Sequence, residues 1–482
     1  MRKITIFTAM LLNAISTCAQ TKDFSGAWEG TMNAGREITI IFHFTKSGNN
    51  TYAGTMDVPA QNAKNLALNK VTVKGDSLIA EMQMAGIVYK SALQNDSTLQ
   101  GMWLQRGAQL PLTLKQIIQP VTAEDAKPQT PAPPYSYNSD DVEYDNADKS
   151  VHFGATFTYP KTGGPFATAL LITGSGQQDR DETIFGHKPF AVLADYLTKK
   201  GYAVLRVDDR GIGKTTGTLL GVTSADFAAD AEAGLAYLKT RPEVDKNKLG
   251  LIGHSEGGAI APMVAAKHPE LDFIVLWAGP IVGGLKTNVE QNAHSLLKAG
   301  IDTTAVNAFK DIHTKELQQF GKSADVSTLN KNVKAVYNQW KQQQSSAVLS
   351  QLYATDTTII GKSIYSIYDG LYDLQWMRFF IVHSFADDLA KVHCKVLAIN
   401  GDKDMQVNAA ENLHAADSIL RANKNPHYKT VVLKGLNHLL QPAVTGEVSE
   451  YGTIQTTIAP EALQTIGDWL DKMCRPGHKM FP

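Results

Sequence analysis

The stretch that decides the fold runs from residue 249 to residue 267 and reads Leu249-Gly250-Leu251-Ile252-Gly253-His254-Ser255-Glu256-Gly257-Gly258-Ala259-Ile260-Ala261-Pro262-Met263-Val264-Ala265-Ala266-Lys267. Its first four residues form a continuous apolar run, which is typical of a strand buried on both faces. Residues 259–267 predict a helix. The glycines on each side of Ser255 permit a tight strand-to-helix turn that would expose the serine hydroxyl. The stretch therefore predicts a serine nucleophile held between a buried strand and a helix.

Strand-like and helix-like segments alternate on both sides of this stretch. The predicted strands are 150–159, 169–172, 202–207, 249–252, 273–276, 395–399 and 429–433. The predicted helices are 188–200, 224–239, 259–267 and 461–474. Alternation of this kind indicates a parallel sheet covered by helices, and so an α/β fold.

A base and an orienting acid follow Ser255 in the order that such a nucleophile requires. Residues 400–407 follow one predicted strand and contain Asp402 and Asp404, and residues 434–438 follow the next strand and end at His438. His438 would take the proton of Ser255 and return it to the leaving group. A carboxylate would hold the imidazole in the correct tautomer. Spacing alone leaves both Asp402 and Asp404 as candidates for the acid.

Taken together, these segments resemble the α/β-hydrolase superfamily, particularly secreted bacterial esterases and serine-aminopeptidase-like hydrolases. The resemblance extends from about residue 142 to residue 474. The stretches that carry it are 173–181, 208–213, 253–258, 400–407 and 436–438. It implies an α/β-hydrolase fold and favours Asp404 as the acid, because the acid usually lies three residues after the loop glycine, here Gly401. Asp402 stays possible because it lies in the same short loop.

An oxyanion hole needs two amides aimed at the developing negative charge. One is expected from Glu256, directly after the nucleophile at the start of a helix. The resemblance places the other in the loop after strand 169–172, where we favour the amide of Ser175, with Gly176 or Gln177 as neighbouring possibilities.

The resemblance also implies a helical cap inserted at about 281–394. Helices are expected at 333–340 and 374–385. The second helix carries Trp376, Phe379 and Phe380, which either wall an acyl pocket or pack the cap onto the sheet; packing is slightly favoured.

Three other features are expected to be structural. Residues 208–215 lack the spacing of a phosphate-binding loop, residues 179–182 suggest a salt-bridged loop, and His254 is expected to be a packing residue.

Residues 1–19 predict a cleaved signal peptide. Arg2 and Lys3 precede an apolar run over residues 4–15, and small residues follow before Gln20. The protein is therefore expected to be exported, to the periplasm or beyond the cell. Cys18 leaves a lipoprotein as the less favoured alternative, since Thr17 is atypical before a lipidated cysteine. No later stretch approaches the about 20 apolar residues of a membrane span.

Residues 20–118 predict a small β-rich domain. Short strand candidates occur at 38–44, 71–73, 77–84, 86–93 and 110–114, which indicates an antiparallel barrel or sandwich. Residues 24–30 resemble the G-x-W-x-G start of lipocalin-like domains, with Trp28 expected in the core of the barrel. Prolines at 120, 128, 131, 133 and 134 predict an extended linker over 119–140. The hydrolase domain would then occupy residues 141–482.

The charge balance limits the partners of this protein. The 46 basic and 47 acidic side chains of the 482 residues give a net charge of -1, without the basic excess that nucleic-acid binders show. The histidines and cysteines lack metal-ligand spacing, so no metal and no cofactor are expected. A small-molecule ester or a short peptide is the expected substrate. The oligomeric state stays open.

The sequence thus predicts a serine hydrolase that cleaves carboxylic esters through an acyl-enzyme, using Ser255, His438 and Asp404. One alternative is a serine aminopeptidase or acyl-peptide hydrolase with the same triad, which would need an anionic clamp for a substrate amino terminus. Glu256 and Asp179 are the candidates for that clamp. The other alternative is a ligand-binding protein, in which the barrel holds a lipid or glycan and the hydrolase domain is inactive.

Overall fold

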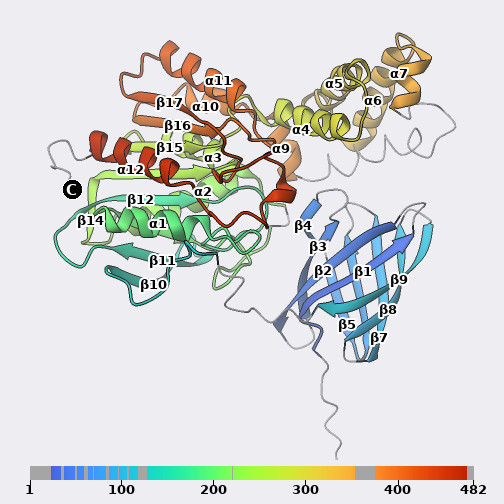
Figure 1. Cartoon of the computed structure of the whole chain (residues 1–482), viewed down its shortest axis with the longest axis horizontal. Helices are drawn as coiled ribbons and strands as arrows, with labels where there is room; N and C mark the ends of the chain where they lie inside the picture. Colours follow the sequence, from blue (N-terminus) through green and yellow to red (C-terminus); the bar gives the residue numbers. More distant parts are fainter. Residues whose placement is uncertain are drawn as a thin grey trace, which may run out of the picture. The chain divides into compact units, whose positions relative to one another are not determined.

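The computed structural model describes residues 23–33, 37–48, 51–58, 63–68, 70–82, 86–95, 97–105, 108–117, 127–219, 221–352 and 375–474. The chain divides into two compact units, Met1–Ile118 and Gln119–Pro482, both drawn in Figure 1. The predicted signal peptide, with Cys18, lies outside the described residues. In the described part of the chain, no helix combines the length and the apolar character needed to cross a membrane.

The first unit is an antiparallel, barrel-like sheet. Its strands are β1 (Gly26–Asn33), β2 (Glu37–Gly48), β3 (Thr51–Val58), β4 (Ala63–Ala67), β5 (Lys70–Lys74), β6 (Ser77–Met82), β7 (Ile87–Asn95), β8 (Thr98–Gln105) and β9 (Ala108–Ile117). They pair in the order β2-β1-β9-β8-β7-β6-β5-β3-β4, and β2 also pairs with β3. This last pairing closes the ring and leaves β4 attached to β3, so the expected barrel-like domain is confirmed.

Large apolar side chains fill the interior of this barrel. Trp28 is fully buried, and its Nε1 donates to the Phe24 carbonyl oxygen at 2.8 Å. The Phe42 ring stacks on Tyr89, with 5.4 Å between ring centroids, and lies 6.4 Å from the Trp103 ring. Alternation of apolar and polar residues along the strands directs these rings inward. Trp28 therefore belongs to the packed core, as expected.

The second unit is built on a mostly parallel sheet. Its strands are β10 (Asn138–Asp145), β11 (His152–Tyr159), β12 (Phe166–Ile172), β13 (Ala203–Val207), β14 (Val244–His254), β15 (Phe273–Trp277), β16 (Lys395–Gly401) and β17 (Tyr428–Leu433). The order is β10-β11-β13-β12-β14-β15-β16-β17. The β10–β11 and β11–β13 pairs are antiparallel, and all the other neighbouring pairs are parallel. Each predicted strand is present. The predicted α/β-hydrolase architecture is confirmed.

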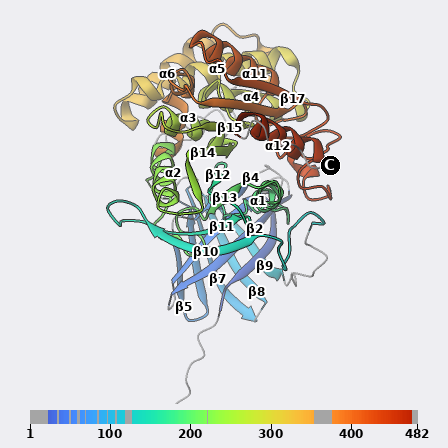
Figure 2. The same ribbon diagram turned by 90° about the vertical axis from the view of Figure 1, so that its left-hand side faces the viewer.

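Helices cover both faces of this sheet. They are α1 (Pro189–Lys199), α2 (Ser224–Leu238), α3 (Glu256–Ala265), α11 (Ala409–Ala422) and α12 (Pro460–Cys474). Leu170 and Leu251 face the core under α2, α3 and α11, and the next residues along the two strands, Leu171 and Ile252, face the core under α1 and α12. Figure 2 shows α2 and α3 on one side of the strands and α1 and α12 on the other. Burial on both faces explains the continuous apolar runs of the strands.

The insertion between β15 and β16 is helical, as expected of a cap. It contains α4 (Gly284–Lys298), α5 (Thr303–Leu317), the 3₁₀ helix η3 (Phe320–Lys322), α6 (Val326–Lys341), α7 (Ser346–Gln351), α9 (Gln375–Val382) and α10 (Phe385–Leu389). The predicted helix 333–340 lies inside α6. The predicted single helix 374–385 is wrong in one respect, because helix α9 ends at Val382 and a second helix, α10, follows it. Ser384 begins α10 there by accepting a hydrogen bond from the Asp387 amide.

The described second half of the proline-rich segment lies along the hydrolase unit. Gln129 Oε1 accepts hydrogen bonds from the Thr457 and Ile458 amides at 2.6 and 3.0 Å, and its Nε2 donates to the Ile458 carbonyl oxygen. Tyr137 OH donates to Asp195 in α1 at 2.9 Å. These contacts tie residues 129–137 to the helices beside the sheet, directly before β10.

Candidate active site

Ser255 lies at the sharp turn between β14 and α3. Its backbone has φ 52° and ψ -119°, a left-handed conformation that a non-glycine residue adopts at a cost of about 1–3 kcal/mol. The Ser255 amide donates to the Trp277 carbonyl oxygen at 2.8 Å, and its own carbonyl oxygen accepts from Gly258. Helix α3 begins at Glu256, three residues earlier than predicted, because the turn leads into the helix without a loop.

The two glycines flanking this turn are required by close backbone approach. A Cβ atom at Gly253 would lie 1.9 Å from the Gly257 carbonyl oxygen, and one at Gly257 would lie 2.2 Å from the Ile172 carbonyl oxygen. No side chain fits at either position without moving the backbone. The glycines thus let α3 pack directly against the end of β12 while the turn presents Ser255 at the carboxyl end of β14.

His438 and Asp404 form a buried pair in the loops after β17 and β16. The His438 Nδ1 atom lies 2.7 Å from Asp404 Oδ2, and the two side chains are 4% and 0% exposed. Asp404 Oδ1 accepts hydrogen bonds from the Gln406 and Val407 amides, both at 2.8 Å. The carboxylate is therefore held by its own loop and accepts a hydrogen bond from His438 Nδ1–H, which leaves Nε2 of a neutral imidazole as the acceptor nitrogen.

Asp402, the alternative acid, makes a different contact. Its side chain is exposed, and its Oδ1 accepts a hydrogen bond from the Gly435 amide at 2.6 Å. It connects the two loops but is not the carboxylate bonded to His438. The geometry brings together the histidine and the acid that the resemblance favours.

The turn at Ser255 and the His438 loop contact each other directly. His254, the last residue of β14, has its Nε2 atom 3.2 Å from the His438 carbonyl oxygen. Trp277 Nε1, at the end of β15, donates to the same oxygen at 3.2 Å. Since β14, β15, β16 and β17 are parallel neighbours, their carboxyl ends bring Ser255, Asp404 and His438 to one edge of the sheet.

The loop after β12, residues 173–182, contains the predicted second oxyanion amide, and we call it the oxyanion loop. Gly174 packs against the nucleophile, because a Cβ atom there would lie 3.2 Å from the Ser255 Cβ atom. Ser175 follows at an exposed position. Glu256 lies on the other side of Ser255, as the first residue of α3. The two predicted oxyanion residues thus belong to the two segments that flank the serine.

Asp209, at the carboxyl end of β13, anchors the oxyanion loop. Its Oδ1 accepts from the Thr173 hydroxyl and its Oδ2 from the Gln178 amide, each at 2.8 Å. Burial raises the pKa of the Asp209 carboxyl well above its ordinary value; the two hydrogen bonds oppose this rise, and the charges of Glu182 and Glu256 add to it. No pattern in the sequence indicates this anchor beyond its place in a loop beside the site.

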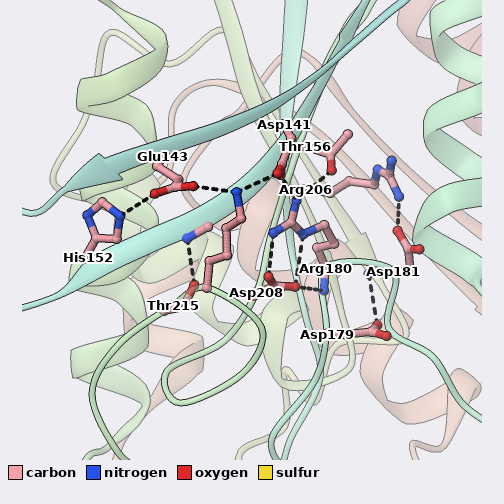
Figure 3. A network of polar contacts seen from close by, with 12 residues as sticks. Asp141, Glu143, His152, Thr156, Asp179, Arg180, Asp181, Arg206, Asp208 and Thr215 are labelled. Carbon is pink, nitrogen blue, oxygen red and sulfur yellow. Dashed lines mark hydrogen bonds and ion pairs between the residues drawn. The ribbon is translucent and has the colours of Figure 1, made fainter.

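Arg180 fastens the far end of the oxyanion loop, as Figure 3 shows. Asp208 accepts three hydrogen bonds from this one residue: from the Arg180 amide at 2.8 Å, Nε at 3.1 Å and NH2 at 2.6 Å. The NH1 atom reaches Asp141 and Thr156 in β10 and β11. Residues 179–182 therefore form the salt-bridged loop expected from the sequence, and the pairing holds the oxyanion loop to three strands.

Replacing Asp208 by alanine is expected to lower the free energy of unfolding by about 3 kcal/mol, because the substitution leaves the half-buried Arg180 guanidinium without its main acceptor. Urea denaturation would measure the change. Lys214→Ala is the matched control, since Lys214 pairs with Asp141 and Glu143 but is 52% exposed; its expected loss is much smaller, because solvent screens exposed ion pairs. Equal losses in the two variants would contradict a special role for Asp208.

Glu256 connects the site to the cap through its side chain. Its Oε1 accepts from the Ser224 hydroxyl at 2.6 Å and from Trp376 Nε1 in α9 at 2.8 Å. Burial raises the pKa of the Glu256 carboxyl, although hydrogen bonds from Ser224, Trp376 and Ser175 act in the opposite direction. No periodicity in the sequence indicates that a cap residue reaches the neighbour of the nucleophile.

The cap aromatics pack on the sheet, which is the favoured of the two expected arrangements. Phe380 is buried in the core beneath α3, and Trp376 and Phe379 are half-buried against it. The Trp376 and Phe380 rings stack, with 5.3 Å between centroids. A separate, mostly apolar pocket lies beside the oxyanion loop and is lined by Phe153, Leu170, Gly174, Gly176, Phe227 and Ile260, together with Asp209 and Asp230.

Across the described ranges, no group of three or more histidine, cysteine or acidic side chains is arranged to hold a metal ion. Three other histidines form hydrogen bonds with neighbouring residues. His187 binds Thr457 and the Tyr451 carbonyl oxygen, His294 binds Glu447, and His383 binds Asp388.

Comparison with known proteins gives a family match and several partial relatives. The model of the family described as "Serine aminopeptidase, S33" matches residues 188–441, which is more than half of the chain. Esterase EstD of Thermotoga maritima is 36% identical over 124 residues, covering 26% of this chain and 29% of that protein. A putative carboxymethylenebutenolidase of Methylorubrum extorquens is 28% identical over 145 residues, covering 28% and 47%. The chain thus spans less than half the length of these two relatives.

Similar solved structures include an esterase of Pyrococcus furiosus, 17% identical with a TM-score of 0.41, covering 70% of this chain and 92% of that one. Another is Est1E of Butyrivibrio proteoclasticus, solved with ferulic acid bound, 16% identical with a TM-score of 0.39, covering 69% and 99%.

Proposed function

Because the chain belongs to the serine aminopeptidase S33 family of hydrolases, we propose that it cleaves carboxylic esters with Ser255 as nucleophile, His438 as general base and Asp404 as the orienting acid. The observation that carries the proposal is the buried His438–Asp404 pair, 2.7 Å between Nδ1 and Oδ2, in the loops next to the strained turn of Ser255. The predicted leader at residues 1–19 makes export part of the proposal.

The reaction would proceed in two halves. The Ser255 Oγ atom forms a bond to the ester carbonyl carbon while His438 Nε2 takes the hydroxyl proton. The amides of Glu256 and Ser175 stabilise the resulting oxyanion. When the carbon–oxygen bond to the alcohol breaks, His438 returns the proton to the leaving oxygen and an acyl-enzyme remains. Water, deprotonated by His438, then releases the acid and restores Ser255.

Asp404 determines which nitrogen of His438 can act as the base. The Asp404 carboxylate can only accept, so it accepts a hydrogen bond from the Nδ1–H group of the imidazole, and the lone pair of the neutral ring lies on Nε2. The same negative charge stabilises the imidazolium formed during attack. Ser255, His438 and Asp404 would therefore supply the nucleophile, the general base and the orienting acid of the proposed reaction.

The peptidase alternative is supported by the family description but less by the candidate clamps. Asp179 is occupied, since Oδ1 accepts from the Asp181 and Thr183 amides and Oδ2 from the Thr183 hydroxyl. The Glu256 Oε2 atom is buried and has no hydrogen-bond partner among the described residues. Burial, however, raises the pKa of the Glu256 carboxyl and so disfavours the charged form that an ammonium group would need. An uncharged ester fits these surroundings better.

The binding-protein alternative has less support. It needs room for a lipid or glycan inside the barrel, yet Trp28, Phe42 and Tyr89 fill that interior. It also leaves the buried His438–Asp404 pair without a purpose. We therefore retain the enzyme as the proposal.

Purified protein is expected to hydrolyse p-nitrophenyl acetate or butyrate with a kcat/KM about 100-fold above that for alanine p-nitroanilide. N-acetyl-alanine p-nitroanilide is the matched control for the free amino terminus. A clear preference for the unblocked anilide over the blocked one would favour the aminopeptidase. Failure of a fluorophosphonate to label the protein would instead indicate an inactive hydrolase domain.

A further inference from the structure

Glu182 is a buried acidic residue that the proposed triad does not use. It lies at the end of the oxyanion loop and is 3% exposed. Its Oε1 accepts a hydrogen bond from the Gly174 amide at 2.7 Å and lies 2.9 Å from His254 Nδ1. Its backbone φ is 53°, so the loop holds this non-glycine residue in a strained conformation. Such strain persists only where the surrounding contacts over-determine it.

His254, expected to be a packing residue, bonds on both sides of its ring. Nδ1 faces Glu182 Oε1, which already accepts from Gly174, and Nε2 faces the His438 carbonyl oxygen at 3.2 Å. A carboxylate and a carbonyl oxygen can only accept, so with Glu182 ionised both ring nitrogens of His254 donate. An imidazole that donates from both nitrogens carries two protons and a positive charge. The geometry therefore describes a buried carboxylate–imidazolium pair.

The electrostatic surroundings agree with this protonation state. Burial by itself lowers the pKa of His254, but the charge and hydrogen bond of Glu182, the His438 carbonyl oxygen and the charge of Asp404 outweigh it and raise that pKa above its ordinary value. The uncharged Trp277 ring packs against the imidazole, with 4.6 Å between centroids. The His438 ring packs against it as well, at 4.7 Å.

We propose that Glu182 and His254 form a buried ion pair that positions the oxyanion loop and the general base around Ser255. The contacts run from the Gly174 amide through Glu182 and His254 to the His438 backbone. They join the loops after β12 and β17 to β14, the strand that ends at His254, directly before Ser255. Neither side chain touches a reacting atom, so both are positioning residues. The inference rests on the proposed function of Ser255 and His438.

A pair of this kind matters because catalysis depends on small distances. An error of about 1 Å in the placement of reacting groups costs about 100-fold in rate. The Asp404 carboxylate fixes the His438 ring, whereas the His254 imidazolium fixes the backbone from which that ring extends. The Glu182 carboxylate at the same time fixes Gly174, next to the predicted oxyanion amide of Ser175.

The decisive variant is Glu182→Gln, which keeps the shape and the Oε1 acceptor but removes the charge. It is expected to lower kcat for a p-nitrophenyl ester by about 100-fold with KM little changed. The second measurement is the ¹⁵N spectrum of the histidine side chains, in which the His254 signals are assigned with His254→Asn. At a pH above the ordinary histidine pKa, wild-type His254 is expected to show two protonated ring nitrogens. The Glu182→Gln variant should lose one of them. Glu143→Gln, from the exposed Glu143–His152 pair at 2.9 Å, is the matched control and should leave kcat unchanged.

Two results would overturn the ion pair: wild-type kcat in Glu182→Gln, or a singly protonated His254 in the wild-type spectrum. The second test does not use Glu182→Gln, so it decides the matter even if that variant does not fold. If wild-type protein hydrolyses no ester while His254 carries two protons, the proposed function fails and the ion pair stands.

Discussion

Ser255→Ala is expected to lower kcat for p-nitrophenyl esters by about 10⁶-fold, down to the rate that binding and the oxyanion amides alone provide. The substitution removes the only atom that can form the acyl-enzyme in the proposed reaction. The fold should survive, because the contacts of the turn are made by the Ser255 backbone amide and carbonyl, which alanine retains. Initial rates with short-chain esters, measured beside circular dichroism, would test both expectations.

Fluorophosphonate labelling provides the independent readout for the same variant. Wild-type protein should be labelled on Ser255, as mass spectrometry of the labelled peptide would show, and Ser255→Ala should not be labelled. Ser150→Ala is the control, because Ser150 lies in an exposed turn where its hydroxyl bonds Asp148. Persistent labelling or ester hydrolysis by Ser255→Ala would rule out Ser255 as the nucleophile.

Asp404→Asn is expected to lower kcat by about 10⁴-fold with little loss of stability. The asparagine can preserve the shape of the loop, but its amide group can donate to His438 Nδ1. The imidazole would then carry its proton on Nε2, where it cannot accept the proton of Ser255. Kinetics on the same ester series, with urea denaturation as a check on folding, would measure the effect.

Asp402→Asn is the matched comparison for that experiment, since both residues belong to the loop after β16. Asp402 is exposed and bonds the Gly435 amide rather than His438, so its replacement should leave kcat little changed. A larger loss for Asp402→Asn than for Asp404→Asn would identify Asp402 as the acid and would contradict the role given to the buried pair.

Local pattern predicted the parts of the structure that depend on neighbouring residues. The apolar run 249–252 lies within β14, and the glycines beside Ser255 mark the turn, because both signals are contained within a few residues. The alternation of apolar runs with helical segments likewise predicted the parallel sheet covered by helices, although it did not give the order of the strands. The start of α3 was predicted too late, since helix propensity does not show that Gly257 packs against the end of β12 and Gly258 against Gly279.

Contacts between distant parts of the chain could not be predicted in this way. Glu182 and His254 are 72 residues apart and Glu256 and Trp376 are 120 apart, and nothing in either segment indicates its partner. The predicted helix 374–385 concealed the break before Ser384, because apolar periodicity continues across it. The sequence also left Asp402 and Asp404 equivalent by spacing, and only the folded loop separates their contacts.

The left-handed backbone of Ser255 has a consequence for engineering this protein. Glycine would adopt φ 52° without penalty and would be the more stable residue at that position, yet it would carry no hydroxyl. Glu182, at φ 53°, differs in this respect, because its buried carboxylate bonds the Gly174 amide and His254, and glycine would leave both without that partner. A redesign that selects residues for thermostability alone would therefore keep Glu182 but replace Ser255, and would lose the activity proposed here. Ser255 marks the position where stability and activity make opposite demands on this chain.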